Sequence, residues 1–157
     1  MKGLEVIGSY LDEWNIVTIT VRLILAVVCG GAIGLTRSVK RRGAGFKTHA
    51  LVCLGSALVM MTGQYIYVDF GAISDIARLA AQVISGVGFL GVGTIMVTRD
   101  NHVKGLTTAA GLWTCAGIGL SIGIGFYSGA AITTILVLVI YRFMGRVDEI
   151  AYEHSRV

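Results

Sequence analysis

The side chains in this sequence that could do chemistry are a few charged and amide groups that interrupt long apolar stretches. They are Arg22, Gln64, Asp75, Arg78 and Gln82. A charge inside a membrane costs roughly 2.5 to 3.5 kcal/mol on insertion scales, so such residues mark candidate functional sites. Asp75, Arg78 and Gln82 follow spacings of three and four, which places them on one helix face. We therefore predict a polar cluster in which Asp75 pairs with Arg78 or Arg22.

A plainer interpretation is available for the same residues. Asp75 can lie at a helix N-terminus, and an arginine near a membrane edge can extend its guanidinium group to the headgroups. For Arg22 both interpretations stay open. Gln82 lies seven residues after Asp75, and this depth favours a buried role for Arg78 and Gln82.

The residue types exclude several kinds of chemistry. Mg²⁺ prefers near-octahedral oxygen coordination from carboxylates and water, yet no acidic residue lies deep in an apolar stretch and Asp75 has arginines as expected neighbours. The three cysteines are isolated and lack metal-ligand spacing. Zinc-protease, nucleophile-elbow and phosphate-loop motifs are also missing. We expect no metal site, no cofactor and no enzymatic activity.

The elements that must position these residues are membrane-spanning helices. Hydrophobic residues make up 55% of the 157 residues and gather in five stretches. A bilayer core about 30 Å thick needs about 20 apolar residues at a rise of about 1.5 Å each, so each stretch can cross once. We predict an all-α integral membrane protein with one domain, 1–157, and five transmembrane helices. The predicted spans are 17–35, 50–68, 76–97, 106–124 and 126–143.

The basic residues predict the orientation. Ten of the thirteen Lys and Arg residues fall in three segments, 37–47, 99–104 and 142–156, which alternate correctly for five crossings. The positive-inside rule then places the N-terminus outside and the C-terminus inside the bacterial cytoplasmic membrane. The basic segments contact lipid headgroups in this interpretation, not nucleic acid. Leu4, Ile7, Leu11 and Trp14 recur at helical spacing and predict a short outer interfacial helix, with a frayed terminus as the alternative.

Small residues are expected to pack the helices together. The sequence has 22 glycines and no proline, and helices in lipid associate through close contact at small residues. The third and fourth spans are predicted to form the tight centre of the bundle. The expected packing positions are Gly30, Gly34, Gly86, Gly88, Gly91, Gly93, Gly111, Cys115, Gly119 and Gly123.

Several long motifs resemble one family of membrane proteins. Residues 75–95 read DIARLAAQVISGVGFLGVGTI, and residues 105–113 read GLTTAAGLW. The first helix pair contributes GAIGL at 31–35 and GAGFKTHALV at 43–52. Together these resemble the MgtC/SapB family of bacterial inner-membrane proteins. The resemblance covers roughly residues 20–143, and it carries over a motif at the fourth span that includes Gly105, Thr107, Thr108 and Trp113.

The resemblance implies a cytoplasmic-membrane protein linked to growth or survival when magnesium is scarce, in some relatives by restraint of the membrane ATP synthase. Two departures from the family pattern stand out. Thr36 occupies a position at which many relatives have Glu, and the chain resembles a short form without the soluble C-terminal domain that many relatives carry. Regulation through that domain would then be absent or supplied by another protein.

Three functions are compatible with these observations. The first is a non-enzymatic protein that modulates a membrane partner or ion homeostasis, in contact with lipids and with a second copy or another membrane protein. The alternative is a transporter or channel for Mg²⁺ or another small ion, built around the predicted polar cluster. The third is a purely structural membrane component. Whether Mg²⁺ binds the chain stays open at this point.

Overall fold

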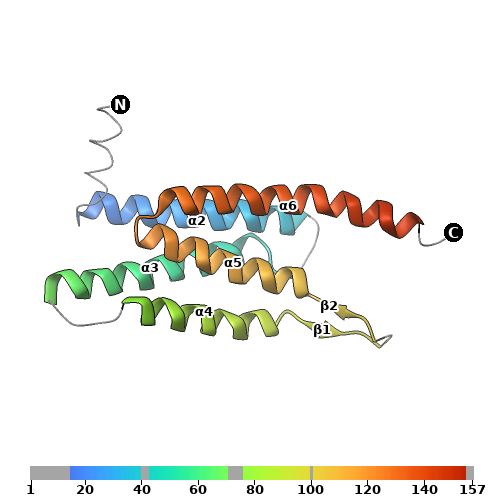
Figure 1. Ribbon diagram of the computed structural model, residues 1–157, viewed down its shortest axis with the longest axis horizontal. Helices are drawn as coiled ribbons and strands as arrows, with labels where there is room; N and C mark the ends of the chain where they lie inside the picture. Colours follow the sequence, from blue (N-terminus) through green and yellow to red (C-terminus); the bar gives the residue numbers. More distant parts are fainter. Residues whose placement is uncertain (1–14, 40–42, 71–75, 100, 155–157) are drawn as a thin grey trace, which may run out of the picture.

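The computed structural model describes residues 15–39, 43–70, 76–99 and 101–154, with side chains described up to residue 143 except Phe70. Residues 1–14 of the predicted interfacial helix, and Asp75, lie outside the described residues. The helices lie side by side with their long axes roughly aligned (Figure 1). The elements are α2 Ile16–Val39, α3 Phe46–Phe70, α4 Ile76–Val92, β1 Met96–Val97, β2 Val103–Lys104, α5 Leu106–Gly123 and α6 Tyr127–His154.

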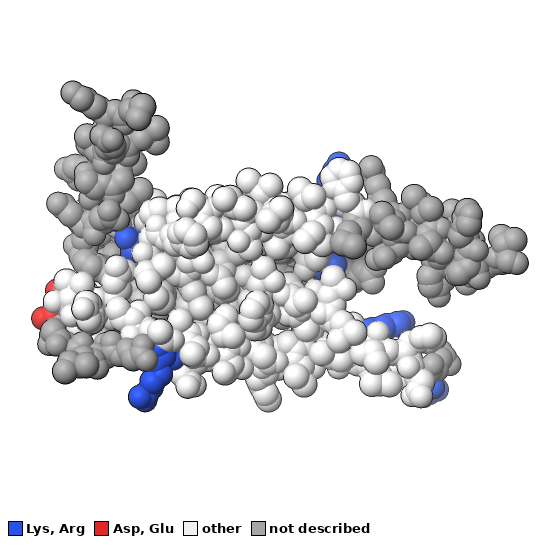
Figure 2. All heavy atoms as spheres, in the orientation of Figure 1, with Lys and Arg blue, Asp and Glu red and all other residues white. Residues whose placement is uncertain are grey.

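The helices have the length and composition of membrane spans. Three are long and apolar enough to cross a bilayer, namely α2, α3 over Phe46–Asp69, and α5. Two shorter apolar helices accompany them, α4 and the Tyr127–Phe143 part of α6. In the view of Figure 2 the coloured charged side chains gather toward the two ends of the bundle, and its middle carries none. The prediction of an apolar helical bundle is confirmed.

The contact between α2 and α3 is a contact between backbones. A Cβ atom at Gly30 would lie 2.6 Å from the His49 carbonyl oxygen, and one at Gly34 would lie 2.7 Å from the Gly45 carbonyl oxygen. Both distances are shorter than real Cβ atoms show, so only glycine fits at these two positions without a shift. The two glycines of α2 thus set how closely α3 approaches.

The next two turns of α3 meet α5 in the same way. A Cβ atom at Gly119 would collide with the Cys53 carbonyl oxygen, and one at Gly123 would lie 2.6 Å from the Ala57 carbonyl oxygen. The carbonyl groups of Gly45, His49, Cys53 and Ala57 are spaced four residues apart and therefore form one row along α3. We call this the carbonyl row. Its first two members face α2 and its last two face α5.

α5 forms the centre of the bundle, and α4 lies outside this centre. Half of the α5 span is buried, and α5 contacts each of the other four helices. In α4 only Val87 and Gly91 are buried. A Cβ atom at Gly86 or Gly88 would meet nothing within 4 Å. The prediction that the third and fourth spans form the tight centre is therefore wrong for the third, because Gly86 and Gly88 face outward and, of the α4 glycines, only Gly91 is buried, against Ala109 of α5.

The third span also ends earlier than predicted. α4 stops at Val92 and the chain turns at Gly93 and Thr94, so Gly93 is not a helix-packing position. β1 then pairs antiparallel with β2, Met96 opposite Lys104 and Val97 opposite Val103. Glycine weakens a helix, and the apolar β-branched residues that follow it favour an extended chain. Residues 93–97 remain apolar like the helix before them, but their backbone is not helical.

The hairpin returns to α5 through a glycine that no other residue can replace without strain. Gly105 has a φ of 98°, and a Cβ atom there would collide with the Thr94 carbonyl oxygen. Gly105 is also the residue before α5. It therefore fixes where α5 begins relative to the end of α4.

Two alanine substitutions in α5 test the carbonyl row. Gly119→Ala should lower the free energy of unfolding by about 1 to 3 kcal/mol, because its Cβ would collide with the Cys53 carbonyl and lie 2.9 Å from the Ser56 Cβ. Gly117→Ala is the matched control on the same helix, since nothing lies within 4 Å of a Cβ there. Denaturant unfolding in mixed micelles measures both. Equal stability of the two variants would contradict the packing described here.

Candidate functional site

A buried arginine of α2 joins this helix to three others at one end of the bundle. Arg22 of α2 is only 3% exposed. Its Nη1 donates to the Gly123 carbonyl oxygen at 2.8 Å and to the Gln64 Oε1 at 3.4 Å, and its Nε donates to the Tyr127 hydroxyl at 2.9 Å. We call Arg22, Gln64, Gly123 and Tyr127 the Arg22 site. It brings Gln64 to Arg22, as the sequence predicts.

The strongest partner of Arg22 is the end of another helix. Gly123 is the last residue of α5, and the last carbonyl groups of a helix have no partner within it. These carbonyls carry the negative end of the helix dipole, so a cation placed there is stabilised. The guanidinium group thus caps α5 while the Tyr127 hydroxyl fixes the start of α6. Its charge is satisfied by oxygen atoms from three different helices.

Arg78 and Gln82 do not join this site. Both side chains are exposed on α4, so the prediction that they are buried within the chain is wrong. The physical reason is the outward rotation of α4, whose buried positions are Val87 and Gly91 instead. Asp75 lies outside the described residues, and its predicted pairing with Arg78 or Arg22 stays a prediction.

A second buried arginine lies toward the other end of α2. Arg37 is 8% exposed, and its Nη2 donates to the Thr108 hydroxyl at 3.0 Å. Its guanidinium carbon lies 4.7 Å from the centre of the Tyr141 ring, within the range of a cation–π contact. The Tyr141 hydroxyl donates to the Thr107 carbonyl oxygen at 3.3 Å. Arg37 therefore joins α2, α5 and α6.

His49 lies beside this arrangement and is fully buried. Its Nδ1 lies 2.9 Å from the Gly45 carbonyl oxygen, which makes Nδ1 the donor and leaves Nε2 as an acceptor. Nε2 is buried and has no hydrogen-bond partner among the described residues. It faces Gly111, where a Cβ atom would lie 3.4 Å away. We call Arg37, His49, Thr108 and Tyr141 the Arg37 site.

The motif at the start of α5 is divided between two environments. The side chain of Thr108 is buried in the Arg37 site, while Thr107 contributes its carbonyl group. Trp113 is 51% exposed and points away from the helix bundle. The motif therefore serves contact with α2 and α6 on one face and leaves its aromatic residue on the outside.

The Arg37 site is missing from the sequence prediction because Arg37 counts there as part of a basic segment and His49 is assigned no role. The structure places Arg37 in a stripe of buried residues along α2, which includes Thr18, Arg22, Ala26, Gly30, Ile33, Gly34 and Arg37. Spacings of three and four place all seven on one helix face. Arg22 and Arg37 are 15 residues apart, or about 22 Å along the helix. The face that carries the glycines toward α3 thus carries one arginine near each end.

The chemistry of the two sites is that of fixed cations and neutral oxygen donors. Both buried charges are guanidinium groups, which stay protonated at any physiological pH. Within the described ranges, no group of three or more His, Cys, Asp or Glu side chains could hold a metal ion. The sites can fasten helices and set a positive potential inside the bundle.

The fold and the sites define an integral membrane protein, a compact bundle of apolar helices fastened at two levels by buried arginines. The profile of the MgtC family matches residues 23–150. The chain belongs to the MgtC family, and the resemblance seen in the sequence is confirmed.

Individual relatives agree with this assignment. The chain is 47% identical over 94 residues to an Escherichia coli K12 protein named "Putative magnesium transporter YhiD", covering 57% of this chain and 43% of the relative. It is 39% identical over 140 residues to an uncharacterized Haemophilus influenzae protein (86% and 59%), and 39% identical over 115 residues to the Brucella abortus protein MgtC (73% and 46%). The chain thus spans about half the length of these relatives. No solved structure matches it.

Removal of the Arg22 side chain should destabilise the bundle. Arg22→Ala leaves the Gly123 carbonyl and the Tyr127 hydroxyl without this partner, which costs about 1 to 3 kcal/mol of unfolding free energy. Arg78→Ala removes an exposed arginine and should change it by less than about 0.5 kcal/mol. In a double-mutant cycle with Tyr127→Phe, unfolding in mixed micelles should show a coupling energy of at least about 0.5 kcal/mol. Strict additivity would argue against a direct contact.

Arg37 should not tolerate lysine. Arg37→Lys keeps the charge but loses the planar group that lies over the Tyr141 ring, at a cost of about 1 to 2 kcal/mol. Arg142→Lys is the control, because Arg142 is an exposed neighbour of Tyr141 in sequence. The midpoint of thermal unfolding in detergent compares the two variants. A shift of equal size in both would mean that the stacked contact adds no stability.

Proposed function

We propose that this chain is a non-enzymatic, multi-pass protein of the bacterial cytoplasmic membrane that supports magnesium homeostasis by binding and modulating a membrane partner. The observation that carries this proposal is the outer face of α4. Arg78, Gln82 and Ser85 are exposed there, and Gly88 leaves open space beside them. We call these four residues the α4 face.

A polar face on a membrane helix is expensive when only lipid covers it. Gln82 lies six residues into α4, about 9 Å along the helix. An amide or hydroxyl group left in hydrocarbon loses its hydrogen bonds with water, whereas a neighbouring helix can replace them. Open space at Gly88 would let such a helix approach closely. These features favour a second copy or another membrane protein as the partner.

The proposal also includes five membrane crossings, with the N-terminus outside and the C-terminus inside the cell. The ends of α2 and α4 and the starts of α3 and α5 lie at the same end of the bundle, together with the β1–β2 hairpin (Figure 1). This end carries Lys47, Arg99 and Lys104. The positive-inside rule favours placing it in the cytoplasm.

The magnesium link is supported by the family and by the printed names of two relatives, YhiD and MgtC. The YhiD name also favours the alternative that the chain itself transports Mg²⁺. The buried charges favour the first proposal, because Arg22 and Arg37 would both repel a dication on its way through the bundle. Mg²⁺ also releases its water slowly and needs oxygen ligands in return.

Substitution on the α4 face separates partner binding from folding. Gly88→Leu should abolish the ability of the gene to restore growth at low magnesium in a deletion strain, because the leucine would fill the space that a partner needs. The variant should accumulate normally, since nothing within the chain lies within 4 Å of that position. Ala131→Leu, an exposed small-to-large change on α6, should restore growth fully. Full growth of the Gly88→Leu strain would contradict the role of the α4 face.

Purified protein in liposomes tests the alternative directly. An Mg²⁺-sensitive dye inside the vesicles should report the same flux with and without the protein. Flux above that of empty vesicles would overturn the non-transport proposal, whatever the growth assay shows.

A further inference from the structure

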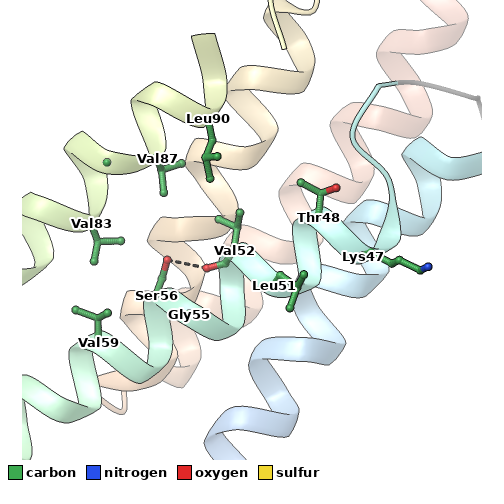
Figure 3. A pocket seen from close by; sticks show the side chains of 11 residues that line it. Lys47, Thr48, Leu51, Val52, Gly55, Ser56, Val59, Val83, Val87 and Leu90 are labelled. Atoms are coloured by element: carbon green, nitrogen blue, oxygen red, sulfur yellow. Dashed lines mark hydrogen bonds between the residues drawn. The ribbon is translucent and has the colours of Figure 1, made fainter. Parts of the chain in front are cut away.

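A groove separates α3 from α4 on the outside of the bundle and has a volume of about 600 Å³. Figure 3 shows Val52, Gly55 and Val59 along one wall and Val83, Val87 and Leu90 along the other. The Ser56 hydroxyl in this wall already donates to the Val52 carbonyl oxygen at 2.8 Å. The interior of the groove is therefore apolar and offers no open hydrogen-bonding group from Ser56.

Two glycines make the groove deep. Gly55 on α3 and Gly86 on α4 line it, and a Cβ atom at either would meet nothing within 4 Å. A larger side chain at Gly55 would begin in open space and extend into the groove.

The groove has a charged end and an apolar end. Lys47 and Thr48 line one end, in the first turn of α3, and both are exposed. Val59 lies twelve residues further along α3, or about 18 Å from Lys47. That distance is close to half of a hydrocarbon core about 30 Å thick. The groove thus runs from one membrane surface to about the middle of the bilayer.

These dimensions and charges fit one lipid molecule. We propose that the groove binds an acyl chain of an anionic phospholipid from the leaflet on the Lys47 side, whose phosphate is held by the Lys47 ammonium group. The positive end of the α3 helix dipole and the Thr48 hydroxyl lie at the same end and favour an anion there. Basic pockets between transmembrane helices on the cytoplasmic side bind anionic headgroups in this way.

A helix of a second copy fits the groove less well. A 20-residue helix about 30 Å long and about 10 Å across occupies roughly 2,400 Å³, several times the volume available. Such a helix would lie on the groove and leave its floor at Gly55 and Gly86 unfilled. An acyl chain is narrow enough to enter, and cavity volumes of about 300 to 1,000 Å³ are typical of small-molecule sites.

Native mass spectrometry of the full chain tests the proposal. After incubation with an equal mixture of phosphatidylglycerol and phosphatidylcholine, the protein should retain one lipid and prefer phosphatidylglycerol about fivefold. Lys47→Gln should remove the preference but keep the bound lipid, because the acyl chain still enters the groove. Gly55→Leu should remove the bound lipid altogether.

Controls separate these outcomes from misfolding. Lys104→Gln changes an exposed lysine outside the groove, and Gly117→Leu adds a side chain where nothing lies within 4 Å on α5. Both should bind lipid as the original chain does. Three results would each overturn the proposal: equal retention of the two lipids, undiminished retention by the folded Gly55→Leu variant, or a protein dimer without lipid that Gly55→Leu abolishes.

Discussion

The close approach of α3 to α2 and α5 along the carbonyl row is the contact on which the rest of this structure depends. In lipid, apolar side chains gain little by leaving the solvent, so helices associate through van der Waals contact and short-range polar contacts instead. Each glycine opposite a carbonyl of α3 brings two backbones into direct contact. The four carbonyl groups of the row serve two neighbouring helices, so α2 and α5 are both placed relative to α3 and thereby to one another.

The two arginine sites follow from this arrangement. A buried guanidinium group needs hydrogen-bond acceptors or aromatic rings held at fixed positions around it. Arg22 finds the last carbonyl of α5 because α5 is held against α3 at Gly119 and Gly123. Arg37 finds Thr108 at the other end of the same helix. The cations do not bring the helices together by themselves, but they fix the lengthwise position of α2, α5 and α6 once the backbones are in contact.

The sequence predicts those features of the fold that depend on composition. It does not predict which neighbour each helix face contacts. Apolar length locates the helices to within a few residues at most ends. Glycine spacing identifies α5 correctly, but the glycines of α4 do not share one environment: Gly86 and Gly88 are exposed, whereas Gly91 meets Ala109 of α5. The number of glycines in a helix does not show what its faces meet. The helix end at Val92 is missed since 93–97 stays apolar while its backbone becomes extended. Arg22 with Gln64 could be predicted as a polar pair, whereas Arg37 and His49 could not, because both are polar residues close to a loop and their burial depends on how α2, α5 and α6 pack.

The peripheral position of α4 links the structure to the proposed function. α2, α3 and α5 are fastened by backbone contacts and by buried arginines, but α4 buries only Val87 and Gly91 among the residues described for it. A helix that buries few of its residues leaves other faces open, in this case the α4 face and a wall of the groove beside α3. A partner on the first face and a lipid in the groove would therefore touch the same helix. α4 is in turn joined through the hairpin and the left-handed Gly105 to the start of α5, where Thr108 meets Arg37.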